Sequence, residues 1–450
     1  MGRLFGTDGI RGIANQELTA ELAFKTGQSG AYVLTKETHR RPRILIGKDT
    51  RKSGDMLEAA LTAGLCSVGA KVISLGVIPT PAVAYLTRLY KADAGVVISA
   101  SHNPCEYNGI KFFNSDGYKL RDEIEDEIED YIEGRKEITD LPTHGAVGYV
   151  ATNHDAVWDY VSFAISTIDV RLDGMKIAID CANGASYQTA FKALNKLGAN
   201  VEAIHNTPDG VNINDQCGST HMDSLKAYVT SIGADVGIAF DGDADRMLAV
   251  DEKGNLIDGD QIMAVCALQM QKEGKLKKDT LVATVMSNLG LFLAGEKYGI
   301  NIPRTKVGDR YVLEKMLADG YSLGGEQSGH IIFLEHNSTG DGLVSALQFL
   351  SVMKKTGKKA SELASVVEVL PQALFNAHVK TEYKNTYMEI DAIRKAIETL
   401  EKEFAGEGRV LIRPSGTEPL VRVMIEGNDI NEITKDAQML ADLIQSRFSE

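Results

Sequence analysis

The sequence predicts an α/β protein of three consecutive mixed α/β domains and a smaller C-terminal α+β domain. A pattern that occurs three times supports this prediction: a helix-like stretch, followed by a glycine and a short apolar run. Strands that alternate with helices form βαβ units, so each copy indicates a sheet with parallel strands. The helix-like stretches cover residues 56–68, 189–197 and 289–298, and the apolar runs cover 69–72, 198–201 and 299–302, the last being the loosest copy.

The repeated pattern ends near residue 369. The rest of the chain is typical of a small α+β domain, with helices expected at 388–403 and 430–447 and strands at 410–413 and 421–426. A chain of 450 residues is also too long for a single hydrophobic core. We therefore expect four domains, at residues 1–150, 151–253, 254–368 and 369–450.

The composition is that of an ordinary globular protein, with 44% hydrophobic and 24% charged residues. No apolar run approaches the roughly 18 residues of a membrane span, and the N-terminus lacks a signal-peptide apolar region, so we expect a cytoplasmic protein with no membrane partner. A net charge of −14 would also repel nucleic acid. The cysteines are scattered without a CxxC pair, which indicates neither a zinc site nor a disulfide framework: Cys66, Cys105, Cys181, Cys217 and Cys266.

Each repeat leads from an apolar strand into a loop of small and polar residues. Ligands of α/β sheets bind at the carboxyl ends of the strands, so three similar units could present their loops to one shared cleft. The loops read SASHNP at 99–104, DGDADR at 241–246 and GGEQSGH at 324–330, after strands expected at 94–98, at 236–240 and at Leu323.

The second loop is the strongest chemical signal. Asp241, Asp243 and Asp245 alternate directly after an apolar strand, and at about 4 Å each like-charge pair would cost on the order of 4 kcal/mol at an effective dielectric near 20. A hard divalent cation relieves this repulsion, whereas a solvated acidic turn is the alternative. A calcium-binding EF-hand is excluded, because Arg246 stands where that loop requires glycine and strand-like segments flank the site.

The other loops are weaker signals by themselves. A serine at the tip of 99–104 could carry a phosphoryl group, but a serine-rich turn without function explains that loop equally well. In the third loop, Glu326 and Ser328 suit sugar hydroxyls and His330 suits proton transfer, although a single histidine is more often structural. The C-terminal loop RPSGTEP at 413–419, with Arg422 beyond it, is typical of a phosphate site, and a generic turn between prolines is the alternative.

In this order, a serine loop, a metal loop, a sugar loop and a phosphate loop resemble the α-D-phosphohexomutase superfamily. Four further motifs are similar to that family: FGTDGIRG at 5–12, NGIKFF at 108–113, VGDRYV at 307–312 and TGDG at 339–342. The similarity covers essentially the whole chain, and within the superfamily it is greatest to the members that act on glucosamine phosphate. The resemblance implies four domains around a central cleft.

The resemblance also implies roles for individual residues. Ser101, beside His102, would be the phosphorylated residue, and Mg²⁺ would be held by a phosphoserine oxygen with Asp241, Asp243 and Asp245. The reacting phosphate would be lined by Arg11, Lys111 and Arg246, with Lys111 or His330 in proton transfer. Sugar hydroxyls would be held by Glu326 and Ser328, and the non-reacting phosphate by Arg413, Ser415, Gly416, Thr417 and Arg422.

The implied reaction interconverts glucosamine 6-phosphate and glucosamine 1-phosphate through glucosamine 1,6-bisphosphate, a step towards UDP-N-acetylglucosamine and cell-wall precursors. The substrate is a small sugar phosphate, and self-association into a homodimer is left open. A glucose or mannose phosphate is the nearest alternative substrate. More distant alternatives are a haloacid-dehalogenase-type phosphatase with Asp241 as nucleophile and a non-catalytic binding protein for calcium or a sugar phosphate.

The sequence departs from the family pattern in two places. The metal loop more commonly reads DGDGDR, so Ala244 replaces a glycine, and a positive φ there would strain it by roughly 1 kcal/mol. Tyr107 stands where family members often carry aspartate. Neither residue is among the expected ligands.

Overall fold

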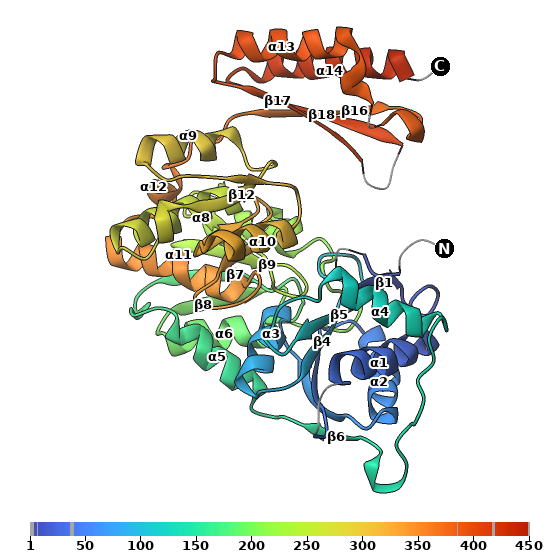
Figure 1. The fold of residues 1–450 in the computed structure, drawn as a ribbon. Coiled ribbons are helices and arrows are strands. Elements are labelled where there is room, and N and C mark those ends of the chain that lie inside the picture. Colours follow the sequence, from blue (N-terminus) through green and yellow to red (C-terminus); the bar gives the residue numbers. More distant parts are fainter. Residues whose placement is uncertain (1–3, 7, 37–39, 385, 416–418, 449–450) are drawn as a thin grey trace. The chain divides into compact units, whose positions relative to one another are not determined.

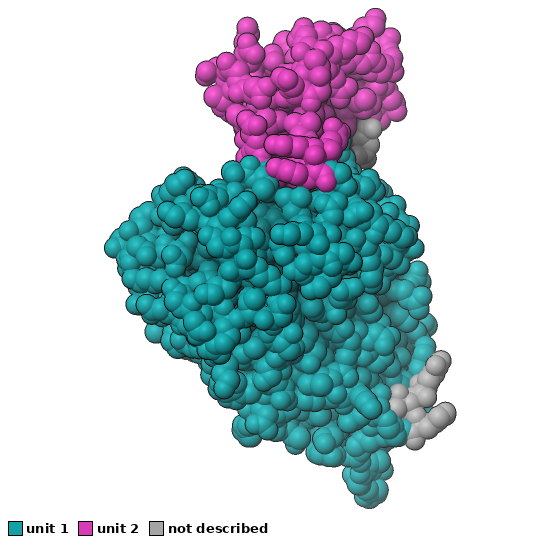
Figure 2. All heavy atoms as spheres, turned by 90° about the vertical axis from the view of Figure 1, so that its left-hand side faces the viewer, with its two compact units in different colours: residues 1–286, 299–366 teal, residues 287–298, 367–450 magenta. Residues whose placement is uncertain are grey.

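The computed structural model describes residues 4–6, 8–36, 40–384, 386–415 and 419–448. The chain forms two compact units, of which unit 1 comprises residues 1–286 and 299–366, and unit 2 comprises residues 287–298 and 367–450 (Figure 2). No helix in the described part of the chain combines the length and the apolar character that crossing a bilayer requires.

Unit 1 contains three sheets, each followed along the chain by the next (Figure 1). The first has the strand order β1-β5-β4-β2-β3-β6. Its strands are β1 (Ile10–Ile13), β2 (Arg43–Lys48), β3 (Lys71–Val77), β4 (Ala94–Ile98), β5 (Tyr107–Asn114) and β6 (Tyr149–Thr152), and its helices are α1 (Ala20–Thr35), α2 (Ser53–Ser67), α3 (Thr80–Leu89) and α4 (Asp122–Ile132).

The second sheet has the order β11-β10-β9-β7-β8. Its strands are β7 (Lys176–Asp180), β8 (Asn200–Ile204), β9 (Val236–Phe240), β10 (Met247–Asp251) and β11 (Leu256–Ile257), and its helices are α5 (Ala156–Ser166), α6 (Ser186–Lys196) and α7 (Asp223–Ile232).

The third sheet has the order β13-β12-β14-β15. Its strands are β12 (Leu281–Thr284), β13 (Arg304–Thr305), β14 (Leu323–Gly325) and β15 (Ile331–Phe333), and the helices of this region are α8 (Gly259–Lys272), α9 (Leu289–Tyr298), α10 (Asp309–Asp319), α11 (Gly342–Thr356) and α12 (Ala360–Ala364).

The three sheets share one arrangement of four strands, which confirms that the repeated pattern is structural. The orders β5-β4-β2-β3, β10-β9-β7-β8 and β15-β14-β12-β13 are equivalent. The first strand of each set is antiparallel to its neighbour and the other three are parallel, so the sheets are mixed instead of purely parallel. A parallel neighbour needs a crossover of about a dozen residues or more, and the polar loops are too short for one. Each loop therefore turns the chain back beside the strand it has just left.

Strands β4 and β9 position the first two loops. Every residue of both strands is buried, as expected for continuous apolar runs that are covered on both faces by helices. The third copy of the pattern is shorter. Residues 299–302 contribute only an isolated bridge at Asn301, and the strand that follows α9 is the two-residue β13.

Helices α1 and α2 approach closely on one face of the first sheet, where Gly27 and Gly64 make the approach feasible. A Cβ atom on Gly27 would collide with the carbonyl oxygen of Leu61, and one on Gly64 would collide with that of Phe24. The contact buries apolar side chains of both helices against β2 and β4, among them Leu57 and Leu61.

Unit 2 is a three-stranded antiparallel sheet with two helices on one face (Figure 1). The strand order is β16-β18-β17. Its elements are β16 (Gln372–His378), α13 (Asp391–Phe404), β17 (Arg409–Pro414), β18 (Leu420–Glu426) and α14 (Ile430–Phe448). The two expected helices and two expected strands are confirmed, whereas the edge strand β16 is not among the sequence predictions.

Helix α9 also packs in unit 2. The buried carboxylate of Glu426 accepts a hydrogen bond from the backbone N–H of Leu289 at 3.0 Å, and the guanidinium of Arg409 lies over the ring of Phe292. The helix of the third repeat is thus joined to the C-terminal sheet by a hydrogen bond and a cation–π contact. The four domain boundaries expected from the sequence stay a prediction.

Candidate active site

The serine loop and the aspartate loop meet inside unit 1. Ser101 follows β4 and Asp241 follows β9, and the Ser101 hydroxyl donates a hydrogen bond to Oδ2 of Asp241 at 2.7 Å. Both residues are buried. Two residues that are far apart in the sequence are therefore within hydrogen-bond distance, as expected if both loops follow strands whose carboxyl ends meet.

The side chains of Arg51 and Asn214 donate hydrogen bonds to the backbone of the serine loop. Ser101 has a left-handed backbone with φ of 53°, a strained conformation that must be stabilised by its surroundings. Arg51 donates to the carbonyl oxygens of Ser101 and Asn103 at 3.0 and 2.8 Å. The side-chain amide of Asn214 donates to the same two oxygens at 2.9 and 3.0 Å.

Neither Arg51 nor Asn214 was predicted from the sequence. Arg51 lies just after β2, at the same sheet edge as the serine loop, and forms a fully buried ion pair with Asp49 at 2.9 Å. The charged pair of Asp49 and Arg51 directly after an apolar strand is a sequence signal from which Arg51 could have been predicted. No local pattern distinguishes Asn214 from other polar loop residues.

The three aspartates of the second loop form a buried cluster suited to a cation. One carboxylate oxygen from each of Asp241, Asp243 and Asp245 lies within 4.8 Å of the other two. Among the described residues, Oδ1 of Asp243 and Oδ1 of Asp245 are buried without a hydrogen-bond partner. Burial, together with repulsion by the other two carboxylates, raises the pKa of Asp241 well above its usual range. A divalent ion with oxygen ligands satisfies both the unpaired oxygens and the charge.

Three groups of the first domain surround the aspartates. Lys111 of β5 lies 3.1 Å from Oδ2 of Asp243, and Thr80 donates to the same oxygen at 2.7 Å. Burial opposes ionisation of Asp243, but Lys111 and these hydrogen bonds hold its pKa below the usual range. Arg11 pairs with Asp8 at 3.0 Å.

His102 lies between Ser101 and the guanidinium of Arg246. Its Nδ1 is 3.4 Å from the Ser101 hydroxyl and 3.1 Å from Nη1 of Arg246. Burial and then the positive charges of Arg246 and Arg11 lower the pKa of His102, which keeps the ring neutral. A neutral Nδ1 can accept a hydrogen bond from Arg246 and so orient that guanidinium.

The third loop is joined to the metal loop through the backbone and through His330. The N–H of Met247, at the start of β10, donates to the carbonyl oxygen of Gly329 at 3.0 Å. The imidazole of His330 is buried, with Nδ1 3.5 Å from Asp245 and Nε2 accepting from the N–H of Gly340 at 3.1 Å. Both ring nitrogens are therefore engaged.

Glu326 and Ser328 lie in the turn between β14 and β15. Oε1 of Glu326 accepts from the N–H of Gly308 at 3.1 Å, which orients this carboxylate against the loop before α10. Ser328 is exposed. Their assignment to sugar hydroxyls stays a prediction.

The C-terminal loop belongs to unit 2, where Arg413 of β17 lies directly opposite Arg422 of β18. Burial and the neighbouring charge of Arg422 lower the pKa of Arg413. Like charges directly opposite each other on adjacent strands repel, and an anion bound by both arginines would lower this repulsion. Ser415 is buried and its N–H donates to the carbonyl oxygen of Leu420 at 2.9 Å. Gly416 and Thr417, which the sequence also predicts in this site, lie outside the described residues.

Ala244 has the positive φ that the sequence analysis considered as a source of backbone strain. Its φ is +56°, and the residue is buried with its carbonyl oxygen accepting from the N–H of Gly342 at 3.0 Å. Glycine adopts this conformation without the Cβ penalty, which explains why the family pattern favours it.

Sequence models of the phosphoglucomutase/phosphomannomutase family match the chain in four consecutive parts. They cover α/β/α domain I at residues 2–139, domain II at 157–254, domain III at 258–370 and the C-terminal domain at 374–443. The fold, the serine loop and the aspartate cluster thus occur in a chain that belongs to the phosphoglucomutase/phosphomannomutase family. The resemblance to the α-D-phosphohexomutase superfamily is confirmed.

Among individual relatives, the phosphoglucosamine mutases of Ruminiclostridium cellulolyticum and Acetivibrio thermocellus are each 62% identical to this chain, with both partners covered completely. A phosphoglucomutase/phosphomannomutase family protein from Burkholderia thailandensis has a similar structure, with a TM-score of 0.79 at 22% identity over 98% of each chain. The N-acetylphosphoglucosamine mutase of Aspergillus fumigatus, solved with GlcNAc-6P and magnesium, gives a TM-score of 0.71 at 17% identity, covering 98% of this chain and 95% of that one. The two structural likenesses support the fold alone.

Proposed function

We propose that this chain is an isomerase that interconverts glucosamine 6-phosphate and glucosamine 1-phosphate through a phosphoserine at Ser101. The 62% identity to phosphoglucosamine mutases over the full length supports the amino sugar as substrate. The single observation that carries the covalent chemistry is the hydrogen bond from the Ser101 hydroxyl to Asp241, in a buried cluster of three carboxylates. A hydroxyl beside a cation site is the arrangement that phosphoryl transfer requires.

The metal ligands proposed are Asp241, Asp243 and Asp245, joined by an oxygen of the phosphoserine. Mg²⁺ bound there would neutralise negative charge on the transferred phosphoryl group. The other contacts to the phosphoryl group come from side chains of this chain. Arg11, Lys111 and Arg246 bind phosphate oxygens, and His102 orients the Arg246 guanidinium.

In the forward direction, the phosphorus–oxygen bond to Ser101 breaks as a new one forms to the 1-hydroxyl of glucosamine 6-phosphate. Lys111 or His330 relays the proton: as the sugar hydroxyl loses its proton, the departing Ser101 oxygen gains one, so the serine hydroxyl is regenerated. The resulting glucosamine 1,6-bisphosphate reorients, and its 6-phosphoryl group returns to Ser101, which leaves glucosamine 1-phosphate. Glu326 and Ser328 hold the sugar hydroxyls in both orientations.

The non-reacting phosphate is assigned to Arg413, Ser415, Gly416, Thr417 and Arg422. The pairing of two arginines on adjacent strands supports an anion site there. Because the two orientations exchange the phosphates, the C-terminal domain must move between them. Its packing as part of a separate compact unit supports such motion.

A cytoplasmic location is proposed as well, and a homodimer stays an open alternative.

Intact mass before and after phosphatase treatment tests the carrier. The expected result is the loss of one phosphate, mapped to Ser101 by peptide sequencing. Ser101→Ala should abolish both the modification and turnover, whereas Ser115→Ala, at an exposed serine of the same domain, should change neither. A Ser101→Ala enzyme with full turnover would rule out the phosphoserine. Comparing glucosamine, glucose and mannose 6-phosphates decides the sugar.

A further inference from the structure

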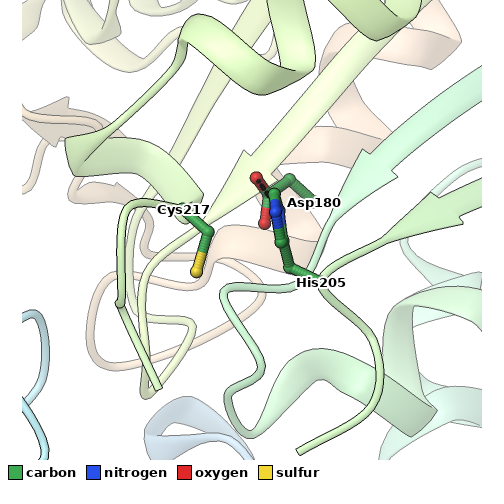
Figure 3. Close-up of side chains that lie close together, drawn as sticks. All are labelled: Asp180, His205 and Cys217. Carbon is green, nitrogen blue, oxygen red and sulfur yellow. Dashed lines mark hydrogen bonds and ion pairs between the residues drawn. The ribbon is translucent and has the colours of Figure 1, made fainter. Parts of the chain in front are cut away.

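A second cluster of metal-ligand side chains lies in the second domain and shares no residue with the aspartate cluster. Asp180 ends β7, His205 directly follows β8, and Cys217 precedes a short helical turn at 218–220. The three side chains converge (Figure 3), and one ligand atom from each lies within 4.8 Å of the other two.

The carboxylate of Asp180 is already oriented. Its Oδ1 accepts from the N–H of Ala182 at 2.8 Å, and its Oδ2 accepts from the N–H of Gly218 at 3.0 Å. Oδ2 lies 2.8 Å from Nδ1 of His205, which donates its proton to that oxygen. Asp180 and Cys217 are fully buried, while the side chain of His205 is 30% exposed, so the cluster has one side open to solvent.

The three ligands offer one oxygen, one nitrogen and one sulfur. This set differs from the all-oxygen aspartate cluster and suits a borderline ion such as Zn²⁺, which binds thiolate, imidazole and carboxylate in tetrahedral sites. Zinc binds cysteine as the thiolate, so the ion takes the place of the thiol proton.

We propose that Asp180, His205 and Cys217 bind a zinc-type divalent ion, with water as the fourth ligand. On binding, the thiol of Cys217 releases its proton to solvent. Nδ1 of His205 becomes the ligand, and its proton moves to Nε2 of the same ring. The ion then replaces the Nδ1 proton as the link between His205 and Asp180.

The position of the cluster connects it with the serine loop. His205 and Cys217 are the two ends of one loop, and that loop carries Asn214, whose amide holds the carbonyl oxygens of Ser101 and Asn103. An ion bound by Asp180 of β7 and by both ends of this loop would hold the loop in place, and with it Asn214, which hydrogen-bonds to the serine loop. The sequence indicated no zinc site because the ligands do not occur as a closely spaced pair.

Cobalt is the probe for this site, since Co²⁺ bound to a thiolate has a charge-transfer absorption in the near ultraviolet that oxygen ligands do not produce. Titration of metal-free protein should give this absorption and saturate it when the thiolate site is filled, whereas Co²⁺ bound by the aspartate cluster should add no such band. Cys217→Ser should abolish it. Because one ligand is lost or weakened, His205→Gln and Asp180→Asn should each lower the cobalt affinity at least 10-fold.

Two matched variants control the assignment. Cys66→Ser, at a half-buried cysteine in α2, and Asp243→Asn, in the aspartate cluster, should both retain the absorption. Absorption that survives Cys217→Ser, or that is lost in Cys181→Ser but not in Cys217→Ser, would overturn the site, as would its absence from folded wild-type protein.

X-ray absorption of wild-type protein with one equivalent of zinc covers the case in which Cys217→Ser does not fold. The expected result is one sulfur at about 2.3 Å with nitrogen and oxygen at about 2.0–2.2 Å. A shell of oxygen alone would refute the proposal. Neither the cobalt titration nor the X-ray absorption measurement requires turnover. A negative result for the zinc-type site can therefore be distinguished from an absence of mutase activity.

Discussion

Lys111 and Asp243 form a buried ion pair in which Nζ lies 3.1 Å from Oδ2. Removing one partner of such a pair leaves a buried charge and typically costs about 3–5 kcal/mol. Lys111→Met should therefore destabilise the protein strongly in EDTA and less in Mg²⁺, because the ion compensates the carboxylate. Unfolding midpoints in the two buffers measure the difference. Lys119→Met is the control, since Lys119 pairs with Asp8 and Asp309 and should lose the same amount in both buffers. Equal losses for Lys111→Met would contradict a cation at Asp243.

Asn214→Ala should impair catalysis without contacting the substrate. The change removes two hydrogen bonds to the carbonyl oxygens of Ser101 and Asn103, each worth roughly 0.5–1.5 kcal/mol. The strained serine loop then loses its geometry, so kcat should fall about 10-fold or more while KM changes little. Steady-state kinetics provides the measurement. Asn212→Ala, in the same loop but bonded to Thr207, should retain kcat, and a similar loss in both variants would mean that the loop is merely destabilised.

Ala244→Gly should stabilise the protein by about 1 kcal/mol, because glycine removes the strain of the positive φ. Chemical denaturation provides the measurement. Ala227→Gly is the control with the opposite sign, since this exposed alanine lies inside α7, where glycine costs about 1 kcal/mol. Loss of stability in both variants would show that Ala244 is not strained.

Arg422→Ala should weaken substrate binding while the fold remains intact. Loss of one charged phosphate contact costs about 1.5–3 kcal/mol, so KM should rise roughly 10- to 100-fold with a smaller change in kcat. Relief of the repulsion with Arg413 should offset part of any loss in stability. Arg394→Ala, at an exposed arginine that pairs with Asp391 on α13, should leave KM unchanged. Unchanged kinetics in Arg422→Ala would exclude this arginine from the phosphate site.

Glu273 should contribute a pH-dependent part of the stability. Hydrogen bonds from Lys275, Gln269 and Lys355 lower its pKa from 4.5 to about 2, against a smaller opposing effect of burial. A lowered pKa in the folded protein stabilises it above the unfolded pKa, and this contribution disappears as the pH falls from about 4.5 towards 2. After allowance for partial exposure, Glu273→Gln should cost about 1–2 kcal/mol at pH 7 and progressively less below pH 4.5.

Urea denaturation of wild type and Glu273→Gln between pH 7 and pH 3 checks this sign. Glu296→Gln, at an exposed glutamate of α9, serves as the control and should show no such trend. A difference that grows as the pH falls would contradict the direction of the pKa shift.

The sequence predicted the elements whose environment is uniform along the chain. Strands β4 and β9 are continuous apolar runs because both faces are covered, so their bounds could be read directly. Strand β16 was missed because it lies at a sheet edge and buries only Ala373 and Ala377 fully, which leaves a weak pattern. The loops after β4, β9 and β14 are short, so the following strands β5, β10 and β15 must run antiparallel to them. Which other strands become neighbours in each sheet depends on the assembled sheet.

The candidate site divides in the same way. Residues that act together within a few positions, such as Asp241, Asp243 and Asp245, were identified from the sequence because their mutual repulsion is a local property. The ligand cluster of Asp180, His205 and Cys217 and the support of Ser101 by Arg51 and Asn214 arise only when separate strand ends meet. A hydrogen bond or a metal bond acts over about 2–3 Å, whereas spacing along the chain does not determine distances between strands. The sequence by itself thus determined the family, the repeat and the chemical groups, and tertiary packing decided which of those groups are within bonding distance.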